Sequence, residues 1–397
     1  MRRAILSDRT DTAPTRARRP TILFVINSIG SGGAERVLDN LLRAAGARHA
    51  DYALHLVLLD REPEMRVLPA LTGKHVLDAR GGLWRSAIGL RRVVRTLRPD
   101  LVVSLLVRAN IATAALPAGQ RRLLCERMHL GSHLAGRYHG WRLRLLRALP
   151  RLLYPRATCI LAVSEGVRRD LIDDFGLAPG RIATINNPYD LERIAADALQ
   201  PPAIALPASF AVAVGRLVDA KGFDLLIDAY RTAGIALPLV ILGDGPARPA
   251  LEAQIAAAGL QTRILLPGFL DNPFAIVGRA AFLVSASRNE GFPNGMAEAM
   301  ALGRAVLATD CPSGPGELLG GRAGSSGMVV DAPFGLIVGD GDRAGLAAGL
   351  RRLADDAALR ARLGTAARAR MEDFRADRIA ADYWALFDRL VAGDGSD

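Results

Sequence analysis

The stretch TILFVINSIGSGGAERVLDNLLRAA, residues 21–45, joins an apolar run to a glycine-rich turn and then to a segment with helical spacing. This pattern predicts a strand over residues 21–27 and a helix over residues 34–45. The same alternation continues through apolar runs at 52–59, 75–79, 101–107 and 159–164, with helical patterns at 83–97 and 165–175. Because strands that are buried on both faces are apolar throughout, we predict a parallel sheet with helices on both sides.

The alternation stops at a proline- and alanine-rich stretch and then starts again, with apolar runs at 210–215, 237–243, 263–269, 280–287, 304–310 and 334–339. We therefore predict two doubly wound α/β domains, residues 20–190 and 209–371, and a linker over residues 191–208. A helix with a broad apolar face is predicted within residues 372–392. Residues 1–19 lack periodicity, and we predict that they form a disordered basic tail.

Length and composition fit this organisation, since 397 residues are enough for two or three domains of about 150 residues each. Half of the residues are hydrophobic and 23% are charged, which is typical of a soluble globular protein. No apolar stretch reaches the roughly 18 residues of a spanning helix, and no apolar core follows the basic N-terminal residues. The three cysteines, Cys125, Cys159 and Cys311, form no CxxC pair. We expect a cytoplasmic protein without a disulfide framework or a zinc cluster.

The net charge of +11 comes from two short stretches. Residues 1–20 hold six arginines and two aspartates, and residues 121–156 hold nine arginines and one glutamate. The rest of the chain is close to neutral. A general nucleic-acid-binding protein spreads positive charge over a folded surface, so this distribution argues against nucleic acid as a partner.

The second basic stretch contains an amphipathic segment, residues 137–156. Its leucines share one helical face and its arginines surround the rest: Leu143, Leu146, Leu149 and Leu153, then Arg142, Arg144, Arg147 and Arg151. Trp141 and Tyr154 lie near its ends, and Pro150 is expected to kink or end the helix. This composition is typical of a helix on an anionic membrane surface. The alternative is an ordinary half-buried helix with solvated arginines.

Ligands of open parallel sheets bind beyond the carboxyl ends of the strands, so the loops there are the candidate sites. The first such loop, residues 27–36, contains Gly32 and Gly33 and leads into a helix. Its backbone amides can approach an anion closely, and the helix N-terminus adds positive potential. The loop is not GxGxxG and has no P-loop lysine. A dinucleotide site with Asp60 on the ribose, or a purely structural turn, are the alternatives.

A second loop, residues 215–222, starts with Gly215 and carries two cations, Arg216 and Lys221, at the beginning of a predicted helix. The two cations can converge on one diphosphate, the arginine through its planar fork and the lysine as a point charge. The chain has only two lysines, Lys74 and Lys221, among its 51 basic residues. Composition alone would therefore favour arginine at position 221. A solvated turn is the alternative.

A third loop holds two glutamates, Glu290 and Glu298, in the segment EGFPNGMAE. Pro293 suits the start of a short helix over residues 294–302, so Glu290 lies in the loop and Glu298 lies one turn into the helix. Carboxylates accept hydrogen bonds from vicinal hydroxyls, so a sugar and a ribose are natural ligands. The helix N-terminus between the two glutamates can receive phosphate. Two glutamates on a surface helix are the alternative.

Equivalent loops of small residues follow other strands, namely 309–317, 243–246 with Gly243, and 267–269 with Gly268 and Phe269. Metal binding is not indicated, because the only DxD motif, Asp340-Gly-Asp342, precedes a predicted surface helix.

Several segments together resemble the retaining glycosyltransferases of family four, which have the GT-B fold of two Rossmann-like domains facing across a cleft. The resemblance covers about residues 20–390 and rests on GGAER (32–36), VSEGVRRDL (163–171), GRLVDAKGFDLLIDAY (215–230), LVILGDGP (239–246), LPGFLDNP (266–273), SRNEGFPNGMAEAMALG (287–303) and ATDCPSGP (308–315).

The resemblance implies an N-terminal acceptor domain, a C-terminal nucleotide-sugar domain and a last helix that crosses back to the N-terminal domain. It implies that Arg216 and Lys221 bind the donor diphosphate and that Glu298 binds the ribose. Glu290 and the segment that follows it, Gly291, Phe292, Pro293 and Asn294, would hold the donor sugar, with backbone amides of that segment as donors. The loop with Gly32 and Gly33 would close over the phosphates, and neither a metal nor a cofactor is expected.

The expected activity is transfer of a sugar, with retention of its anomeric configuration, from a nucleotide-diphosphate donor to a hydroxyl of a lipid-linked or polysaccharide acceptor. The expected donor is a UDP-sugar. A UDP-sugar epimerase of the same fold is the alternative. Many relatives carry a functional histidine in the N-terminal domain. In this chain Arg127, His129, His133 and His139 are all candidates, and His129 is preferred because it lies nearest to a strand end.

Overall fold

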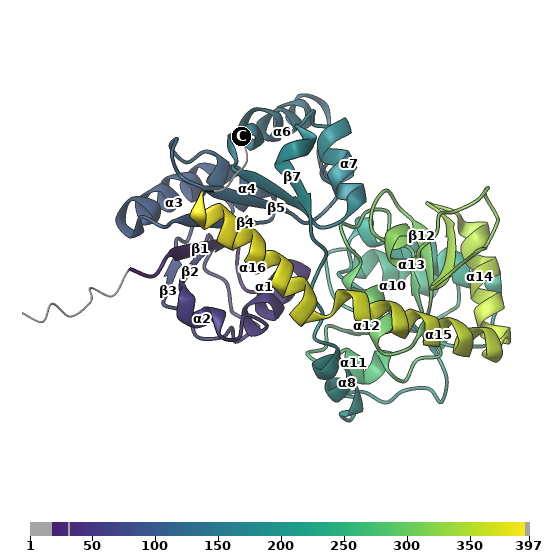
Figure 1. Cartoon of the computed structure of the whole chain (residues 1–397). Helices are drawn as coiled ribbons and strands as arrows, with labels where there is room; N and C mark the ends of the chain where they lie inside the picture. Colours follow the sequence, from purple (N-terminus) through teal and green to yellow (C-terminus); the bar gives the residue numbers. More distant parts are fainter. Residues whose placement is uncertain (1–17, 31, 394–397) are drawn as a thin grey trace, which may run out of the picture.

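The computed structural model describes residues 18–30 and 32–393, which form two α/β domains side by side (Figure 1). The predicted basic tail falls mainly on residues 1–17, outside the described residues. Arg18, at the end of that predicted tail, donates hydrogen bonds to the Arg98 carbonyl (3.1 Å) and to Asp100 Oδ2 (3.2 Å).

The N-terminal domain contains a seven-stranded, entirely parallel sheet in the order β3-β2-β1-β4-β5-β6-β7. The strands are β1 Thr21–Ile26, β2 Ala53–Leu58, β3 Gly73–Val76, β4 Leu101–Leu105, β5 Arg122–Glu126, β6 Cys159–Ala162 and β7 Ile182–Thr184. The helices are α1 Gly33–Arg43, α2 Arg48–Asp51, α3 Leu83–Leu97, α4 Val107–Ala114, α5 Leu130–Arg137, α6 Gly140–Leu153 and α7 Glu165–Asp173.

The C-terminal domain repeats this plan with the order β10-β9-β8-β11-β12-β14-β13, in which only the β13–β14 pair is antiparallel. Its strands are β8 Ala211–Val214, β9 Leu239–Leu242, β10 Ile264–Gly268, β11 Phe282–Ser285, β12 Ala305–Asp310, β13 Val330–Ala332 and β14 Gly335–Gly339. Its helices are α8 Leu191–Leu199, α9 Phe223–Ala233, α10 Arg248–Ala257, α11 Phe274–Val277, α12 Asn294–Ala301, α13 Pro315–Leu319, α14 Arg343–Asp355 and α15 Ala357–Met371.

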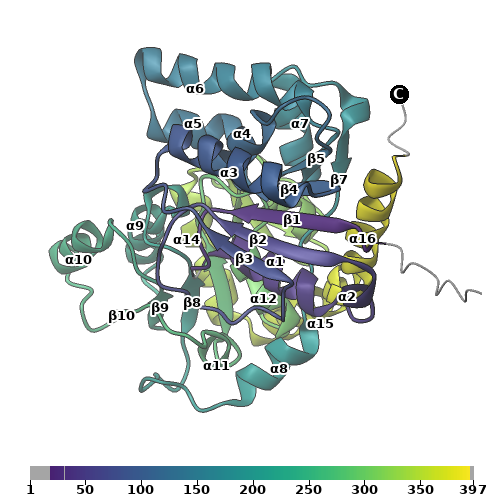
Figure 2. The ribbon, with the colours of Figure 1, turned by 90° about the vertical axis from the view of Figure 1, so that its left-hand side faces the viewer.

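Both faces of the N-terminal sheet are covered, which explains the uninterrupted apolar run of β1. Ile22, Phe24 and Ile26 pack in one cluster with residues of α1 and of the last helix, α16 Ala376–Ala392. Leu23 and Val25 pack in a second cluster with residues of α3 and α4. Figure 2 shows α3, α4, α5 and α6 on one side of this sheet. The prediction of two doubly wound α/β domains is confirmed.

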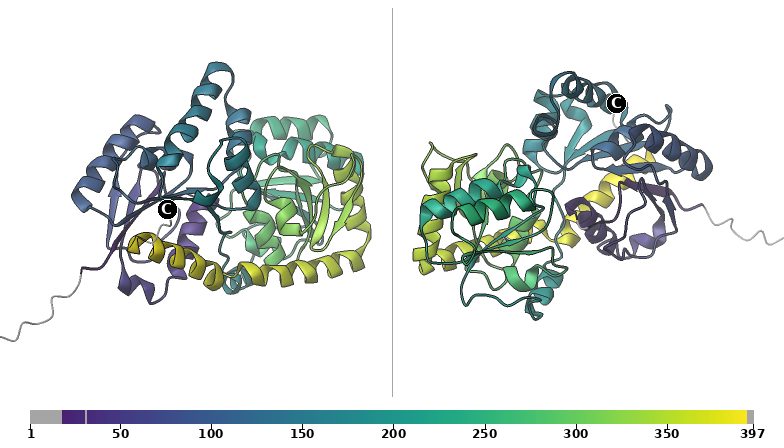
Figure 3. Two further views of the ribbon diagram at one scale, coloured as in Figure 1. Left: turned by 45° about the horizontal axis from the view of Figure 1, so that its top comes forward. Right: turned by 180° about the vertical axis from the view of Figure 1, so that it is seen from behind.

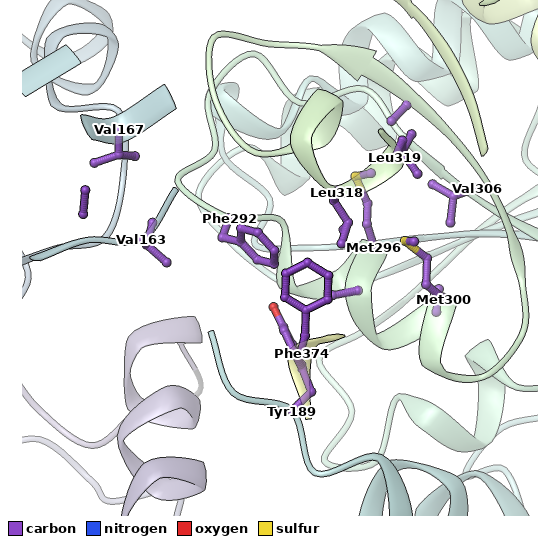
Figure 4. Close-up of a cluster of buried hydrophobic side chains, with 14 of the residues drawn as sticks. Val163, Val167, Tyr189, Phe292, Met296, Met300, Val306, Leu318, Leu319 and Phe374 are labelled. Carbon is purple, nitrogen blue, oxygen red and sulfur yellow. The ribbon is translucent and has the colours of Figure 1, made fainter. Parts of the chain in front are cut away.

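The chain crosses between the domains at two points that lie against each other. The Tyr189 amide donates to the Phe374 carbonyl (2.9 Å), and the Ala376 amide donates to the Tyr189 carbonyl (2.8 Å). After this point α16 runs along the N-terminal domain, packing on α1 and β4 (Figures 1 and 3). The side chains of Tyr189, Phe292 and Phe374 form an aromatic cluster at the crossing (Figure 4).

The segment predicted as a linker, residues 191–208, is only partly one. Its first half is helix α8, which packs against α11 and α12 of the C-terminal domain. The pattern missed this helix because only one of its side chains, Ile194, is buried.

The basic stretch 121–156 begins with β5, a strand that is absent from the predicted apolar runs although the choice of His129 assumed a strand end just before it. Its ends are charged, but Arg122 and Glu126 are both buried. The Arg122 guanidinium donates to the carbonyls of Ala114 (2.8 Å), Leu116 (3.0 Å) and Pro117 (2.7 Å). Part of the local positive charge is therefore internal.

Helix α6 has the leucine face of the predicted amphipathic helix, but it ends at a different residue from the one expected. Its four leucines pack against the core, as the alternative of a half-buried helix predicts: Leu143, Leu146, Leu149 and Leu153. The helix continues past Pro150 for three residues. Tyr154, expected at the surface, is fully buried and donates to Glu126 Oε2 (2.8 Å). That contact and burial raise the pKa of Tyr154, with burial as the larger cause.

Candidate active site

Three glycine-containing loops meet where β8, β9 and β10 end. The Gly215 amide donates to the Leu242 carbonyl (3.0 Å), and the Gly243 amide donates to the Gly268 carbonyl (2.9 Å). Gly243 has φ +139°, and a Cβ there would lie 1.9 Å from the Gly215 carbonyl oxygen. Only glycine allows this close approach. Phe269, the residue that follows the last residue of β10, has an exposed ring.

Lys221 and Glu290 come together beside these loops. Lys221 Nζ lies 2.5 Å from Glu290 Oε1, and the Ser287 hydroxyl donates to the same oxygen (2.7 Å). The two residues follow neighbouring strands, β8 and β11. They are therefore in contact although they are 69 positions apart in the sequence. Gly222, with φ +60°, ends the short turn that carries Lys221 and begins α9. The structure thus brings into contact two residues that were assigned to the donor site from the sequence.

Glu298 faces the other domain. It is buried in α12 and forms an ion pair with Arg36 of α1, a partner that the sequence did not predict. Burial alone would lower the pKa of the Arg36 guanidinium, but the adjacent Glu298 carboxylate outweighs burial and raises it. The guanidinium also lies over the Phe274 ring, 5.5 Å from the ring centre.

The N-termini of α1 and α12 face each other across the domain boundary. A Cβ at Gly33, the first residue of α1, would lie 2.3 Å from Nδ2 of Asn294, the first residue of α12. The N-cap residues, Gly32 and Pro293, make no side-chain capping hydrogen bond, although the Glu35 carboxylate lies beside Gly32 at the start of α1. Two uncapped N-termini direct backbone N–H groups and the positive ends of their dipoles at the same region. Such a region favours an anion.

Asn294 is held by residues of the domain crossing. Its Oδ1 accepts hydrogen bonds from the Tyr189 hydroxyl (2.6 Å) and from Asn187 Nδ2 (2.7 Å). Asn187 in turn accepts from Arg127, whose other terminal nitrogen donates to the Tyr383 hydroxyl of α16 (2.9 Å). This network extends from α16 to the start of α12.

The loop that begins at Glu290 (the glutamate loop) also contacts the N-terminal domain through its backbone. A Cβ at Gly291 would lie 2.0 Å from the Arg127 carbonyl oxygen, and the Ser164 hydroxyl donates to the Gly291 carbonyl (2.8 Å). Nearby, Glu317 accepts hydrogen bonds from the amides of Glu165 (2.8 Å) and Gly166 (2.7 Å) at the start of α7. These contacts between residues more than 100 positions apart were not predictable from local patterns.

The side chains of two predicted donor-site residues, Phe292 and Arg216, lie in opposite environments. The Phe292 side chain is buried in the aromatic cluster of Figure 4, so only its backbone can reach the cleft. The Arg216 side chain is exposed and makes no ion pair or hydrogen bond with the described residues. Arg216 is thus available to a ligand, whereas Lys221 already has a carboxylate partner.

His129 lies in the cleft, next to the glutamate loop. Asn289 Nδ2 donates to the His129 carbonyl (3.3 Å), and the imidazole lines a cavity of about 240 Å³. His133 lies within α5, where burial lowers its pKa, and His139 is exposed before α6. The structure therefore brings His129, rather than the other two histidines, to the other candidate residues.

The described residues contain no cluster of side chains suited to binding a metal ion. Within residues 18–30 and 32–393, no group of three or more histidine, cysteine, aspartate or glutamate side chains could hold a metal ion. Asp342 of the DxD motif caps α14 by accepting from the Gly345 amide (2.9 Å).

Comparisons with known proteins show the family to which this chain belongs. Residues 31–193 match the family described as Glycosyltransferase Family 4, and residues 209–356 match Glycosyl transferases group 1. The chain is 32% identical, over 373 residues, to the N-acetylgalactosamine-N,N'-diacetylbacillosaminyl-diphospho-undecaprenol 4-alpha-N-acetylgalactosaminyltransferase of Campylobacter jejuni. That alignment covers 90% of this chain and 96% of the relative. This chain belongs to the glycosyltransferases.

Solved structures place this glycosyltransferase in the GT-B fold, which confirms the predicted fold class. Sucrose-phosphate synthase from Thermosynechococcus elongatus superposes with a TM-score of 0.77 at 19% identity, covering 95% of this chain and 100% of the other. Anabaena HepE in complex with UDP gives a TM-score of 0.69 at 20% identity, covering 93% and 99%.

Proposed function

We propose that this glycosyltransferase transfers a sugar, with retention of configuration and without a metal, from a UDP-sugar to a hydroxyl of a lipid-linked or polysaccharide acceptor. The observation that carries the proposal is the position of the Lys221–Glu290 pair, beside the facing N-termini of α1 and α12. A nucleotide diphosphate needs compensating positive charge, and a sugar needs hydrogen-bond acceptors for its hydroxyls. This site offers both.

In the proposed complex, Arg216 and Lys221 bind the diphosphate together with the backbone amides of Gly32 and Gly33. Glu290 and the amides of the following residues hold the donor sugar. Glu298 accepts hydrogen bonds from the ribose hydroxyls and shares its carboxylate with Arg36. HepE, which has the same fold, was solved with UDP, and this supports uridine as the base.

The reaction breaks the bond between the sugar C1 and the diphosphate oxygen, and the electron pair stays on the diphosphate. The acceptor hydroxyl oxygen bonds to C1 on the same face, and its proton goes to the departing phosphate oxygen. Negative charge on the diphosphate grows during this step. Lys221, Arg216 and the helix amides therefore stabilise the transition state more than the ground state.

The Campylobacter relative is named for an acceptor on diphospho-undecaprenol, which supports a lipid-linked acceptor here. The test is a screen of UDP-sugars by thermal shift, followed by transfer to undecaprenyl-diphosphate-linked saccharides and product analysis by NMR. We expect one UDP-sugar to raise Tm and the product to keep the α-configuration of its donor. An inverted linkage would contradict the proposed mechanism, and release of an isomerised UDP-sugar without acceptor would contradict transfer.

We further propose that α6 lies on the inner face of a bacterial membrane, as a peripheral contact. No helix among the described residues is long and apolar enough to cross a membrane. On α6, the side chains of Trp141, Leu145 and Leu152 are 70%, 54% and 70% exposed. Their spacing of four and seven residues places them on one face. Exposed apolar side chains with arginines beside them are typical of an interfacial helix.

Removing two of these arginines should weaken binding to anionic vesicles. Each arginine near such a surface contributes about 1 kcal/mol, so Arg142→Ala with Arg144→Ala should lower the partition coefficient by roughly thirtyfold. Flotation on vesicles with and without anionic lipid measures this. The matched control is Arg231→Ala with Arg343→Ala, two exposed positions on the C-terminal domain. Equal binding by both double variants would exclude α6 as the contact.

A further inference from the structure

Asp170 of α7 supports the first turn of α5, the helix that follows His129. The Asp170 side chain is buried, and its oxygens accept hydrogen bonds from the Leu130 amide (2.6 Å) and the Gly131 amide (3.2 Å). A Cβ at Gly131 would lie 2.7 Å from Asp170 Oδ1 and 2.4 Å from Asp174 Oδ2. Glycine at 131 thus allows the carboxylates to reach the start of α5.

The same carboxylate lies beside the His129 ring. Asp170 Oδ1 is 3.5 Å from His129 Nδ1, and the Ser132 amide donates to Nδ1 at 3.3 Å. The Ser132 hydroxyl is 3.1 Å from Nδ1 as well. All of these contacts involve Nδ1. Within the described part of the chain, Nε2 of His129 makes no hydrogen bond.

These partners determine which ring nitrogen carries a proton. An amide N–H can only donate, so a neutral imidazole that accepts it at Nδ1 has its own proton on Nε2. A carboxylate can only accept, so Asp170 cannot hydrogen-bond the unprotonated Nδ1 of this tautomer and instead holds the neighbouring Leu130 and Gly131 amides. Nε2 is therefore the hydrogen-bond donor of this imidazole.

His129 also lies between the two substrate-binding regions. The cavity of about 240 Å³ is lined by His129, Asp170 and Gly166 of the N-terminal domain and by Pro312 of the C-terminal domain. Arg169, Asp173 and Asp174 complete its charged wall. The His129 carbonyl is bonded to Asn289, the residue before Glu290.

We propose that Asp170 is a positioning residue that fixes the backbone after His129, so that the Ser132 amide reaches Nδ1, Nε2–H donates a hydrogen bond to a substrate oxygen in the cleft, and His129 does not act as a general base. This inference rests on the proposed function, since it assigns how His129 takes part in transfer. Asp170 itself acts only through the histidine and the backbone of α5.

The direct test is a double-mutant cycle measured on sugar transfer. Asp170→Asn should lower kcat by about ten- to a hundredfold, as for other carboxylates that orient a histidine, with KM for the UDP-sugar changed less than about twofold. In a His129→Gln background the same substitution should change kcat by less than about twofold. Equal losses in both backgrounds would mean that Asp170 is merely structural. Asp356→Asn, which removes a helix-capping carboxylate from the other domain, is the matched control and should leave kcat unchanged.

A second measurement needs no Asp170 variant and no activity. Side-chain ¹H–¹⁵N NMR of the wild-type protein, with the His129 signals assigned through His129→Gln, should show a proton on Nε2 throughout the pH range of activity. A bare Nε2 with a proton on Nδ1 alone would overturn the inference. Full activity of His129→Gln would remove His129 from the proposed reaction, whereas the NMR result would still report the Ser132 contact at Nδ1. The two failures are therefore distinguishable.

Discussion

Lys221→Met is expected to lower kcat for sugar transfer by about a hundred- to a thousandfold, the effect of removing one group that stabilises transition-state charge. Methionine keeps much of the aliphatic length of the side chain but has no charge for the departing diphosphate. The protein should stay folded, because Lys221 is partly exposed and Glu290 retains the Ser287 hydroxyl as a partner. Steady-state kinetics with circular dichroism as the folding check measure both effects.

The chain supplies its own control for this experiment. Lys74 is the other lysine, and it lies on the edge strand β3 in an exposed pair with Glu64 (2.5 Å). Lys74→Met removes the same charge from the protein and should leave kcat within about twofold, since a surface ion pair contributes little. Similar activity of the two variants would contradict a role for Lys221 at the diphosphate.

Glu298→Ala is expected to raise KM for the UDP-sugar by about a hundredfold or more. Two hydrogen bonds between a carboxylate and the ribose hydroxyls contribute roughly 3 kcal/mol together. The substitution also leaves Arg36 without its carboxylate in a buried position, so Tm should fall. Kinetics and calorimetric titration with UDP measure the loss of affinity, and thermal unfolding measures the loss of stability.

A second variant separates these two effects. In Arg36→Met with Glu298→Ala, no uncompensated charge remains, so Tm should recover part of its value while UDP affinity stays low. Glu252→Ala, which removes an exposed glutamate of α10, controls for the loss of negative charge and should leave KM unchanged. UDP affinity that returns to the wild-type value in the double variant would show that Glu298 acts only through Arg36.

The strands and helices were largely predictable because burial of both sheet faces leaves uninterrupted apolar runs. The exceptions have physical reasons. Strand β5 has charged residues at both ends, and these are buried because main-chain carbonyls satisfy Arg122 and hydrogen bonds from Tyr154 and Asn110 reach Glu126. Helix α8 was missed because it buries a single side chain against the C-terminal domain.

The residues of the candidate site can also be separated into those that the sequence predicted and those that depended on packing. Lys221, Glu290 and Glu298 were predictable because each follows a strand of the same sheet, and parallel strands end at one edge. Phe292 was assigned to the donor site through its backbone, and the sequence did not indicate that packing at the domain crossing turns its ring into the core. Whether a loop side chain points to a ligand or to a core depends on what packs behind the loop.

The sequence by itself determined two doubly wound domains and the loops that carry cations and carboxylates, because periodicity and strand-end chemistry are local properties of the chain. The tertiary structure alone decided which residues meet across the cleft. Arg36 and Glu298, which meet across the domain boundary, are 262 positions apart. Within the N-terminal domain, packing likewise brings Asp170 of α7 beside His129, which precedes α5. Such contacts depend on how the elements pack and how the two domains approach each other, and no local spacing encodes that approach.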